Sequence, residues 1–333
     1  MRLLVLGGTQ FVGHALVAEA LARGWDVTVA NRGLSGPPAP GVTAVVLDRT
    51  QPGAFDVLGD ATYDLVADTW AGAPSVVRDA ARALAGRTGR WLYVSSRSVY
   101  AWPIERGADE SAPVVDGDPD AAATEYAQDK RGGELAAERA LGADRVVHLR
   151  AGLILGPRDN VGRLPWWLRR MALGGPTLAP DRPGLPIQYV DPRDLAALGL
   201  DASADGRSGP VDVVSPPGAA TLGDLLGACI ATTRSDAELV WVEPRFLLDA
   251  QVAPWTELPV WLPEDDEAYA LHTSDVTRAL DWGLRIRPLA ETVDDCWSWV
   301  QAVDRDGTAP PPRDGIGIDP AREAALLAAW AAR

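Results

Sequence analysis

The feature that most constrains the fold is a glycine-rich turn that directly follows a short apolar run. Arg2–Leu6 is predicted to be a buried strand, Gly7-Gly8 end it, and residues 11–23 have the apolar spacing of a helix. A strand, a glycine turn and a helix in this order present backbone N–H groups to a phosphate. The same residues also fit an ordinary glycine-rich strand-to-helix connection.

The first half of the chain repeats this alternation. Apolar runs predict further strands at residues 26–30, 43–47, 64–67, 90–95 and 145–149, and helical spacing predicts helices at residues 73–84 and 121–141. Strands that alternate with helices form a parallel sheet covered on both faces. The sequence therefore predicts an α/β protein built on a doubly wound parallel sheet.

The character of the chain changes after about residue 155, where proline and glycine become frequent and tryptophans cluster. Residues 222–232, 289–303 and 320–332 have helical spacing, and residues 304–315 form an exposed segment rich in proline and glycine. We predict a dinucleotide-binding domain over residues 1–155 and a smaller, loop-rich substrate-binding lobe, mainly residues 156–333. A later segment, around residues 185–215, is expected to complete the sheet.

The net charge of −15 bears on partners rather than on the fold. It argues against nucleic acid, whose phosphates need a basic surface, and against an anionic membrane surface. No apolar run is long enough to cross a bilayer and no signal peptide is recognised, which favours a cytoplasmic protein with a small-molecule substrate. Cys229 and Cys296 lack metal-binding spacing, so no metal site is expected and both thiols are predicted to be buried.

Candidate cofactor ligands begin at the glycine turn and continue past the second strand. An NAD enzyme would place a carboxylate near position 31 to bind the adenosine ribose. Asn31 would not repel a 2′-phosphate and Arg32 can pair with one, which favours NADP over NAD, although Arg32 also fits a solvated loop arginine. Asp48 and Arg49, after the third strand, are candidates near the adenine. The turn itself contributes Gly7, Thr9, Gln10, Phe11, Val12 and Gly13.

Lys130 stands out because it is the only lysine among the 31 basic residues. Tyr126 precedes it by four residues, so both lie on one face of the predicted helix. A neighbouring ammonium favours the phenolate and lowers the pKa of a tyrosine towards the range needed for acid/base catalysis. The alternative, a surface pair on a helix, remains. The spacing indicates a catalytic and cofactor-binding pair.

A hydroxyl group follows the strand predicted at residues 90–95, in the run Val94-Ser95-Ser96-Arg97-Ser98-Val99-Tyr100. Together with the glycine turn and the Tyr126/Lys130 pair, this run resembles the extended short-chain dehydrogenase/reductases of the NAD-dependent epimerase/dehydratase family. Residues 149–157, 187–194 and 283–289 also look like family elements. The turn departs from the family pattern at Gln10, which places a side chain where the diphosphate would lie.

The resemblance implies a Rossmann-type fold and assigns roles to individual residues. Tyr126 would be the general acid/base, Lys130 would hold the nicotinamide ribose and tune Tyr126, and Ser96, four residues before Tyr100, would orient the substrate. Asp68, Thr69 and Trp70 would border the ribose. Dehydratases of the family carry an Asp-Glu pair where this chain has Arg97-Ser98, so a 4,6-dehydratase is disfavoured. The resemblance also implies a homodimer through the helices predicted at 73–84 and 121–141.

The substrate side is less specific. Ser98, Arg163, Trp166, Gln188 and Tyr189 are candidates for contact with a sugar-nucleotide or similar small metabolite, and Arg169 and Arg170 follow in the same amphipathic segment. Arg193 and Asp194 are expected to hold structure. The function predicted is an NAD(P)-dependent reductase, dehydrogenase or epimerase. The alternatives are a dinucleotide-sensing protein without turnover, which would not need Tyr126, and a nucleic-acid-binding relative, which would need a basic patch.

Overall fold

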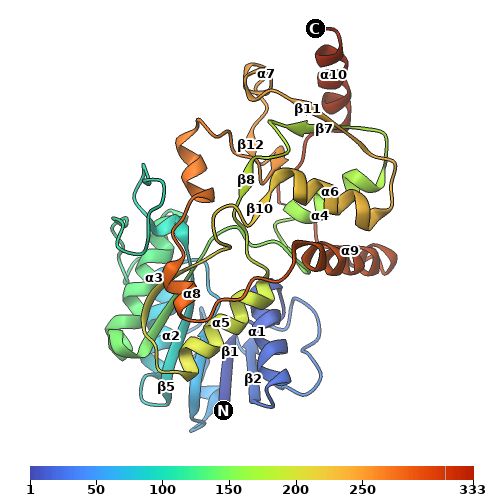
Figure 1. The fold of residues 1–333 in the computed structure, drawn as a ribbon. Coiled ribbons are helices and arrows are strands. Elements are labelled where there is room, and N and C mark those ends of the chain that lie inside the picture. The colour runs from blue at the N-terminus through green and yellow to red at the C-terminus, as the bar shows by residue number, and fades with distance from the viewer. Residues whose placement is uncertain (312) are drawn as a thin grey trace.

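The computed structural model describes residues 1–311 and 313–333, which form two lobes (Figure 1). The lower lobe in that view contains a seven-stranded sheet in the order β3-β2-β1-β4-β5-β6-β9, and all six pairings are parallel. Its strands are β1 (Arg2–Leu6), β2 (Asp26–Asn31), β3 (Thr43–Val46), β4 (Tyr63–Asp68), β5 (Thr88–Ser96), β6 (Val146–Ala151) and β9 (Gly209–Val213). The predicted doubly wound parallel sheet is confirmed.

The central strands are continuous apolar runs because helices cover both faces of the sheet. Helices α1 (Phe11–Ala22) and α5 (Pro192–Ala204) pack together on one face, and α2 (Pro74–Leu84) and α3 (Tyr126–Leu141) pack on the other. Each face has its own apolar core, and in β1 Leu3, Leu4 and Val5 are fully buried. The chain order reverses beside β1, with β2 on one side and β4 on the other, and ligands of such sheets bind at that point.

Helix α3 begins five residues later than the predicted start at residue 121. Its first residue is Tyr126, and Glu125 is the N-cap in an extended conformation. The Asp129 carboxylate accepts hydrogen bonds from the backbone N–H and the hydroxyl of Thr124, at 2.9 and 2.6 Å. This local alternative to helical bonding ends the approach segment before the helix and leaves Tyr126 in the first turn.

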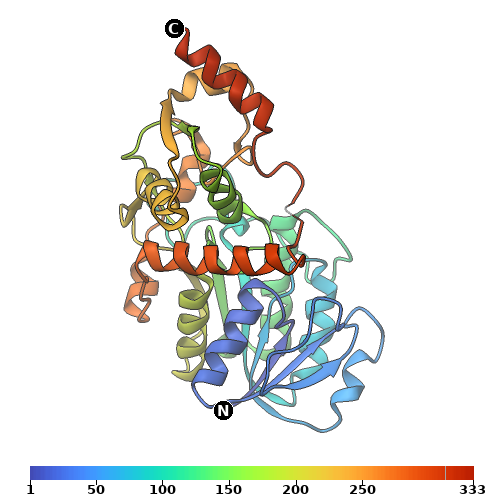
Figure 2. The same cartoon turned by 90° about the vertical axis from the view of Figure 1, so that its right-hand side faces the viewer.

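The upper lobe is smaller and rich in loops. Trp167 and Trp261 are fully buried in its core. This core is closed mainly by the helices α4 (Arg163–Ala172), α6 (Leu222–Thr233) and α9 (Leu289–Arg305). Figure 2 shows α9 lying across the molecule between the sheet and the rest of this lobe. Its other helices are α7 (Pro244–Asp249) and α10 (Pro320–Ala331), whereas α8 (Thr277–Asp281) packs against β9 of the sheet. The strands of the upper lobe are β7 (Pro176–Pro180), β8 (Pro186–Ile187), β10 (Ala220–Thr221), β11 (Glu238–Val242), β12 (Pro254–Trp255) and β13 (Leu258–Pro259).

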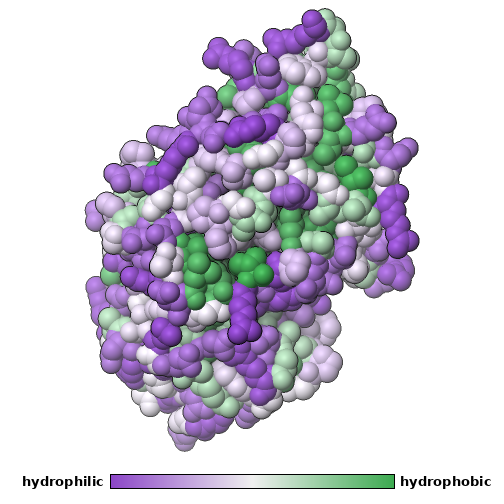
Figure 3. Space-filling view, viewed as in Figure 1, coloured by the Kyte–Doolittle hydropathy of each residue, from purple (hydrophilic) through white to green (hydrophobic). Residues whose placement is uncertain are grey.

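The two lobes are not consecutive halves of the chain. After the first upper-lobe segments, the chain returns to the sheet as α5 and β9, and then enters the upper lobe again. The face shown in Figure 3 is largely hydrophilic, with apolar residues gathered near the middle of the molecule and along one side of the upper lobe. In the part of the chain that the structure describes, no helix combines the length and apolar character that crossing a membrane requires.

Candidate active site

The glycine turn between β1 and α1 is shaped so tightly that side chains would not fit in it. Gly7 and Gly8 have φ values of +125° and +92°, which favour glycine. A Cβ on Gly8 would lie 2.9 Å from Val29 Cγ1, and a Cβ on Gly13 would lie 2.7 Å from the backbone nitrogen of Gly8. The turn therefore brings backbone to within reach of a ligand, as dinucleotide diphosphates require.

Gln10 occupies the N-cap position of α1 and is exposed, and its side chain caps no backbone N–H group. Phe11, the first residue of the helix, has a φ of 33°. The N–H groups of the first turn are thus left for a ligand. The departure of Gln10 from the family pattern adds a side chain at the rim of the turn without closing it.

Replacing Gly13 by alanine is expected to weaken dinucleotide binding about fivefold to a hundredfold. The new Cβ would push on the Gly8 backbone, and overpacking of this kind costs about 1–3 kcal/mol. Fluorescence titration with NADPH and NADH measures the loss. Gly86→Ala is the matched control, because nothing lies within 4 Å of a Cβ at Gly86. Equal affinity of Gly13→Ala and wild type would show that the turn is not the diphosphate site.

A cleft of about 240 Å³ opens at this turn and extends along the ends of β2, β3 and β4. Asn31 donates its side-chain amide to Gly7 O at 2.9 Å and accepts from the Gly33 N–H at 2.7 Å, so it braces the wall of the cleft. Arg32 is exposed beside it. Asp48 accepts hydrogen bonds from the N–H and hydroxyl of Thr50, which hold the pKa of its carboxyl below the ordinary value. The predicted cofactor residues that line the cleft are Gly7, Thr9, Gln10, Asn31, Arg32, Asp48, Arg49, Thr69 and Trp70.

Asp68 and Arg49 take a role that the sequence did not indicate. The Arg49 guanidinium forms a two-bonded ion pair with the Asp68 carboxylate, at 2.6 and 2.8 Å, and lies 5.1 Å from the Trp70 ring centroid. Asp68 is fully buried. The expectation that Asp68 borders the ribose is therefore corrected: its carboxylate fixes Arg49, which in turn supports Trp70 at the edge of the cleft.

Tyr126 and Lys130 lie one helical turn apart at the start of α3, with opposite exposure. Tyr126 is 51% exposed, whereas Lys130 is 3% exposed. The Lys130 ammonium donates to the backbone carbonyls of Trp70 and Val94, both at 2.7 Å, and lies 5.0 Å from the Tyr93 ring centroid. These bonds tie α3 to the carboxyl ends of β4 and β5 and leave one of the three ammonium donors. Burial lowers the pKa of Lys130 to about 8.

The two neighbouring serines of β5 face different environments, as strand alternation requires. Ser95 is buried and donates its hydroxyl to Glu134 at 2.7 Å. Ser96 is partly exposed, and its Oγ lies 3.1 Å from the Ser98 Oγ and accepts a bond from the Ser98 N–H at 3.1 Å. Ser96 and Ser98 therefore share one side of the strand end, on the turn formed by Arg97–Val99.

A buried ionic network beneath this strand end holds the framework of the site. Glu134, on α3, accepts two hydrogen bonds from Arg150 of β6, at 2.9 and 3.0 Å. Despite its burial, these bonds and charges lower the pKa of Glu134 to about 2. No local sequence pattern predicts the Glu134–Arg150 pair, because its two residues lie on different elements.

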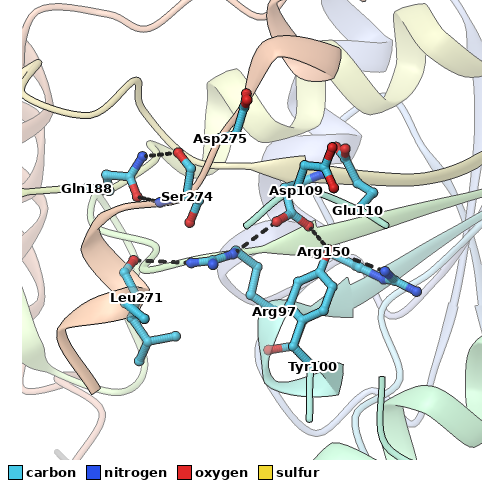
Figure 4. Close-up of polar contacts among 12 residues, drawn as sticks. Arg97, Tyr100, Asp109, Glu110, Arg150, Gln188, Leu271, Ser274 and Asp275 are labelled. Carbon is cyan, nitrogen blue, oxygen red and sulfur yellow. Dashed lines mark hydrogen bonds and ion pairs between the residues drawn. The ribbon is translucent and has the colours of Figure 1, made fainter. Parts of the chain in front are cut away.

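The network continues towards the upper lobe (Figure 4). Arg97 donates to the Asp212 carboxylate of β9 and to the carbonyl of Leu271, both at 3.1 Å, and Tyr100 donates its hydroxyl to Asp212 at 2.6 Å. Burial raises the pKa of Asp212 to about 6. Arg97 therefore links the strand end that carries Ser96 to the Glu267–His272 turn above it.

Two predicted substrate residues are enclosed. Gln188 is fully buried and spends its amide on Ser215 O, Ser274 O and the Ser274 N–H, at 2.7, 3.0 and 2.7 Å. Tyr189 is 2% exposed within the upper-lobe core. Neither side chain faces an open cleft, and three backbone groups already satisfy the Gln188 amide. The expected contact of Gln188 and Tyr189 with substrate is therefore corrected to a structural role.

Other predicted residues are placed as follows. Trp166 lies in a separate groove between α4 and α10, packed against Gly317. Arg193 pairs with Asp191 and Asp295, and Asp194 pairs with Arg287, which agrees with the structural role expected of them. Arg163, at the start of α4, lies over Trp255 with 5.0 Å from its guanidinium carbon to the ring centroid.

Together the glycine turn, the sheet order and the cleft form an arrangement that is typical of dinucleotide-binding α/β proteins. The model of the NAD-dependent epimerase/dehydratase family matches residues 3–210, and the chain belongs to that family. A comparison with curated protein sequences finds no match.

Solved structures with the same fold include three from bacteria. A putative epimerase from Burkholderia cenocepacia is 20% identical, with a TM-score of 0.68, 90% of this chain and 98% of that chain being covered. WbmH from Bordetella bronchiseptica, solved with NAD+, is 18% identical, with 90% and 98% covered and a TM-score of 0.66. UDP-glucuronic acid 4-epimerase from Bacillus cereus, solved with NAD, is 14% identical, with 91% and 99% covered and a TM-score of 0.64. At these identities the likeness concerns the fold.

Proposed function

We propose that the protein is an NAD(P)-dependent oxidoreductase or epimerase that acts on a hydroxyl or keto carbon of a sugar-nucleotide or similar small metabolite. One observation carries the proposal. Tyr126 and Lys130 lie at the start of α3, and the Lys130 ammonium donates to backbone carbonyls at the carboxyl ends of β4 and β5. The glycine turn lies at the same edge of the sheet. Structural neighbours solved with NAD or with UDP support the cofactor and substrate classes.

In this proposal each residue moves or holds one group. The nicotinamide cofactor supplies the hydride acceptor or donor. Tyr126 takes the hydroxyl proton as the carbon–hydrogen bond breaks, and returns it in the reverse direction. The Lys130 ammonium is fixed by two backbone carbonyls and offers its remaining donor to a ribose hydroxyl. Ser96 orients the substrate oxygen from the opposite side.

A dehydratase is disfavoured in the proposal for a structural reason. Elimination needs an acid and a base beside the hydroxyl residue. Here Arg97 is buried in an ion pair with Asp212, and Ser98 bonds to Ser96. Neither side chain offers a carboxylic acid. The family's other chemistry, hydride transfer with retention of the substrate's groups, needs only Ser96, Tyr126 and Lys130.

For the cofactor we propose NADP, with NAD as the alternative. Asn31 is held by Gly7 and Gly33, Asp48 is held by Thr50, and Arg49 is held by Asp68. Of the side chains at the β2 end of the cleft, Arg32 is the exposed cation, and a 2′-phosphate would meet it without a competing carboxylate at position 31.

Changing Arg32 to alanine is therefore expected to weaken NADPH binding about tenfold or more, since a charge-assisted hydrogen bond contributes about 1.5–3 kcal/mol. NADH lacks the phosphate, and its affinity should stay at the wild-type value. Titration of both dinucleotides against wild type and variant measures the ratio. If the affinities for NADPH and NADH changed by the same factor, Arg32 would not select between the cofactors, and the result would favour NAD.

The central experiment is to purify the protein, release any bound nucleotide and identify it by mass. Retained NAD+ would favour an epimerase that recycles its cofactor, and exchangeable NADPH would favour a reductase. Binding of neither dinucleotide at micromolar concentration would refute the proposal.

A second candidate, a dinucleotide-binding protein without turnover, is favoured by one observation: Lys130 commits two of its three donors to backbone carbonyls.

A further inference from the structure

The charge state of Lys130 decides whether this residue has a hydrogen-bond donor to offer. An ammonium has three donors, whereas a neutral amine has one fewer. Two donors of Lys130 are already used by the carbonyls of Trp70 and Val94, both at 2.7 Å. A neutral Lys130 would therefore have no donor left for a ribose hydroxyl. Because burial lowers the pKa of Lys130 to about 8, a small further loss of stabilisation would discharge it near neutral pH.

The carboxylates around Lys130 are committed to other groups. Burial is the main cause of the lowered pKa of Lys130, and these carboxylates oppose it, while Arg49 adds to it. In the part of the chain that the structure describes, none of the carboxylates forms an ion pair with Lys130. Each has another partner: Asp68 pairs with Arg49, Glu134 pairs with Arg131 and Arg150, and Asp129 accepts hydrogen bonds from Thr124. The ammonium therefore lacks a direct anionic neighbour.

Tyr93 supplies the direct contact that the carboxylates do not. The Lys130 Nζ lies 5.0 Å from the centroid of the Tyr93 ring, and both side chains are buried. The face of an aromatic ring is negative and attracts a cation, more strongly where water is excluded. The Tyr93 hydroxyl donates to the Trp70 carbonyl at 3.2 Å, and the same carbonyl accepts from Lys130. The ring and the ammonium are thus held to one backbone oxygen.

The packing around Tyr93 fixes its ring in this position. Tyr93 is fully buried on β5, and a Cβ on Gly133 of α3 would lie 2.4 Å from the Tyr93 Oη. The helix can pass this close because residue 133 is glycine. Burial raises the pKa of Tyr93 well above its ordinary value, so its hydroxyl remains a neutral donor. The Trp70 N–H donates to Asp68 at 2.9 Å, which fixes the accepting peptide as well.

We propose that Tyr93 is a positioning residue that keeps Lys130 in its ammonium form and so preserves a donor for the cofactor ribose. This role deepens the proposed function and rests on it. Tyr93 acts through Lys130, since it is fully buried and does not line the cleft at the glycine turn. A tyrosine that only filled the core would have no effect on the charge of Lys130, and this difference can be measured.

The test follows the charge of Lys130 directly, because the chain contains one lysine. The full chain, isotope-labelled in lysine alone, gives one side-chain signal, and NMR titration of that signal yields the pKa of Lys130. Tyr93→Phe is compared with the same protein carrying a trifluorinated phenylalanine at position 93, whose ring has nearly the same shape but a weaker negative face. Tyr93→Leu removes the ring. Trp91→Leu, which removes another buried ring from β5 and the same core, is the matched control.

We expect Tyr93→Phe to keep the wild-type pKa of Lys130, because the ring remains. The fluorinated ring and Tyr93→Leu should lower this pKa by about 0.5 to 1.5, the range that a buried cation–π contact contributes, and Trp91→Leu should leave it unchanged. The fluorinated ring preserves the packing, so it decides the question even if Tyr93→Leu fails to fold. Equal pKa values of Lys130 with the plain and the fluorinated ring would overturn the role of Tyr93.

The consequence for the cofactor is measured by titrating NADPH and NADH against the same proteins at increasing pH. Because a neutral Lys130 has no free donor, affinity should fall as the pH rises through the pKa of Lys130, and it should fall at lower pH with the fluorinated ring. An affinity that does not follow the NMR titration would overturn the link to the ribose. The NMR titration needs no cofactor, whereas failure to bind any dinucleotide overturns the proposed function.

Discussion

Tyr126→Phe is expected to lower turnover by about 10²–10⁴-fold, the range that general acid/base catalysis contributes. The substitution removes the hydroxyl that exchanges a proton with the substrate and leaves the ring at the start of α3. Because Tyr126 is 51% exposed and its hydroxyl makes no hydrogen bond within the described residues, folding and dinucleotide affinity should be unaffected. Steady-state assays of cofactor absorbance, with whichever substrate of a sugar-nucleotide panel wild type converts, measure the effect.

The matched control is Tyr63→Phe, which removes a hydroxyl from a buried tyrosine on β4. It should turn over like wild type. Normal turnover of Tyr126→Phe would assign catalysis to another group. If wild type and Tyr126→Phe bind NADPH equally well and wild type converts no substrate, the result would favour the binding protein without turnover.

Glu134→Ala is expected to destabilise the fold by about 3–5 kcal/mol, because it leaves the buried charge of Arg150 without its partner. Glu134 is fully buried and also accepts bonds from Ser95 and Arg131, at 2.7 and 2.8 Å. Urea unfolding followed by circular dichroism gives the free energy of unfolding. Glu291→Gln, which breaks the more exposed pair with Arg287, should change it little.

The same carboxylate makes a pH prediction. The folded pKa of Glu134, about 2, lies below its ordinary value of 4.5. Its stabilisation is therefore present above about pH 4.5 and is lost as the pH falls towards 2. Glu134→Gln cannot ionise, so its stability should fall less steeply across this range than that of wild type. If the stability of wild type and of Glu134→Gln fell in parallel as the pH is lowered, the Glu134 charge would not be the source of this stabilisation.

Local patterns predicted the strands of the sheet well, and they also singled out the candidate residues of the glycine turn and the Tyr126/Lys130 pair. The strands, the glycine turn and the Tyr126/Lys130 spacing all depend on residues near in sequence, where periodicity determines which side a residue faces. The helical spacing predicts a start of α3 that is five residues too early, because periodicity does not reveal the side-chain bond between Thr124 and Asp129 that competes with the helix. The depth at which Lys130 is buried could not follow from its spacing alone.

Long-range pairings were beyond the reach of these patterns. The sequence contains 30 arginines beside its one lysine. Nothing local distinguishes Arg49, which is paired with Asp68, from Arg163, for which the described residues form no ion pair. Gln188 looked like a pocket residue because its neighbours resembled a family element, yet its amide is used within the fold. Partner choice across the sheet depends on packing geometry, which periodicity does not encode.

The late return of the chain as β9 has a consequence for synthesis on the ribosome. Until residue 213 has emerged, the open edge of β6 has no neighbour and the Arg97 and Tyr100 side chains lack their Asp212 acceptor. The sheet of the nascent first half therefore cannot be completed until then, and its unpaired strand edge can pair with other chains. A fragment that stops at residue 155 should accumulate as aggregate, and its rescue would require residues 192–213 supplied in the same chain.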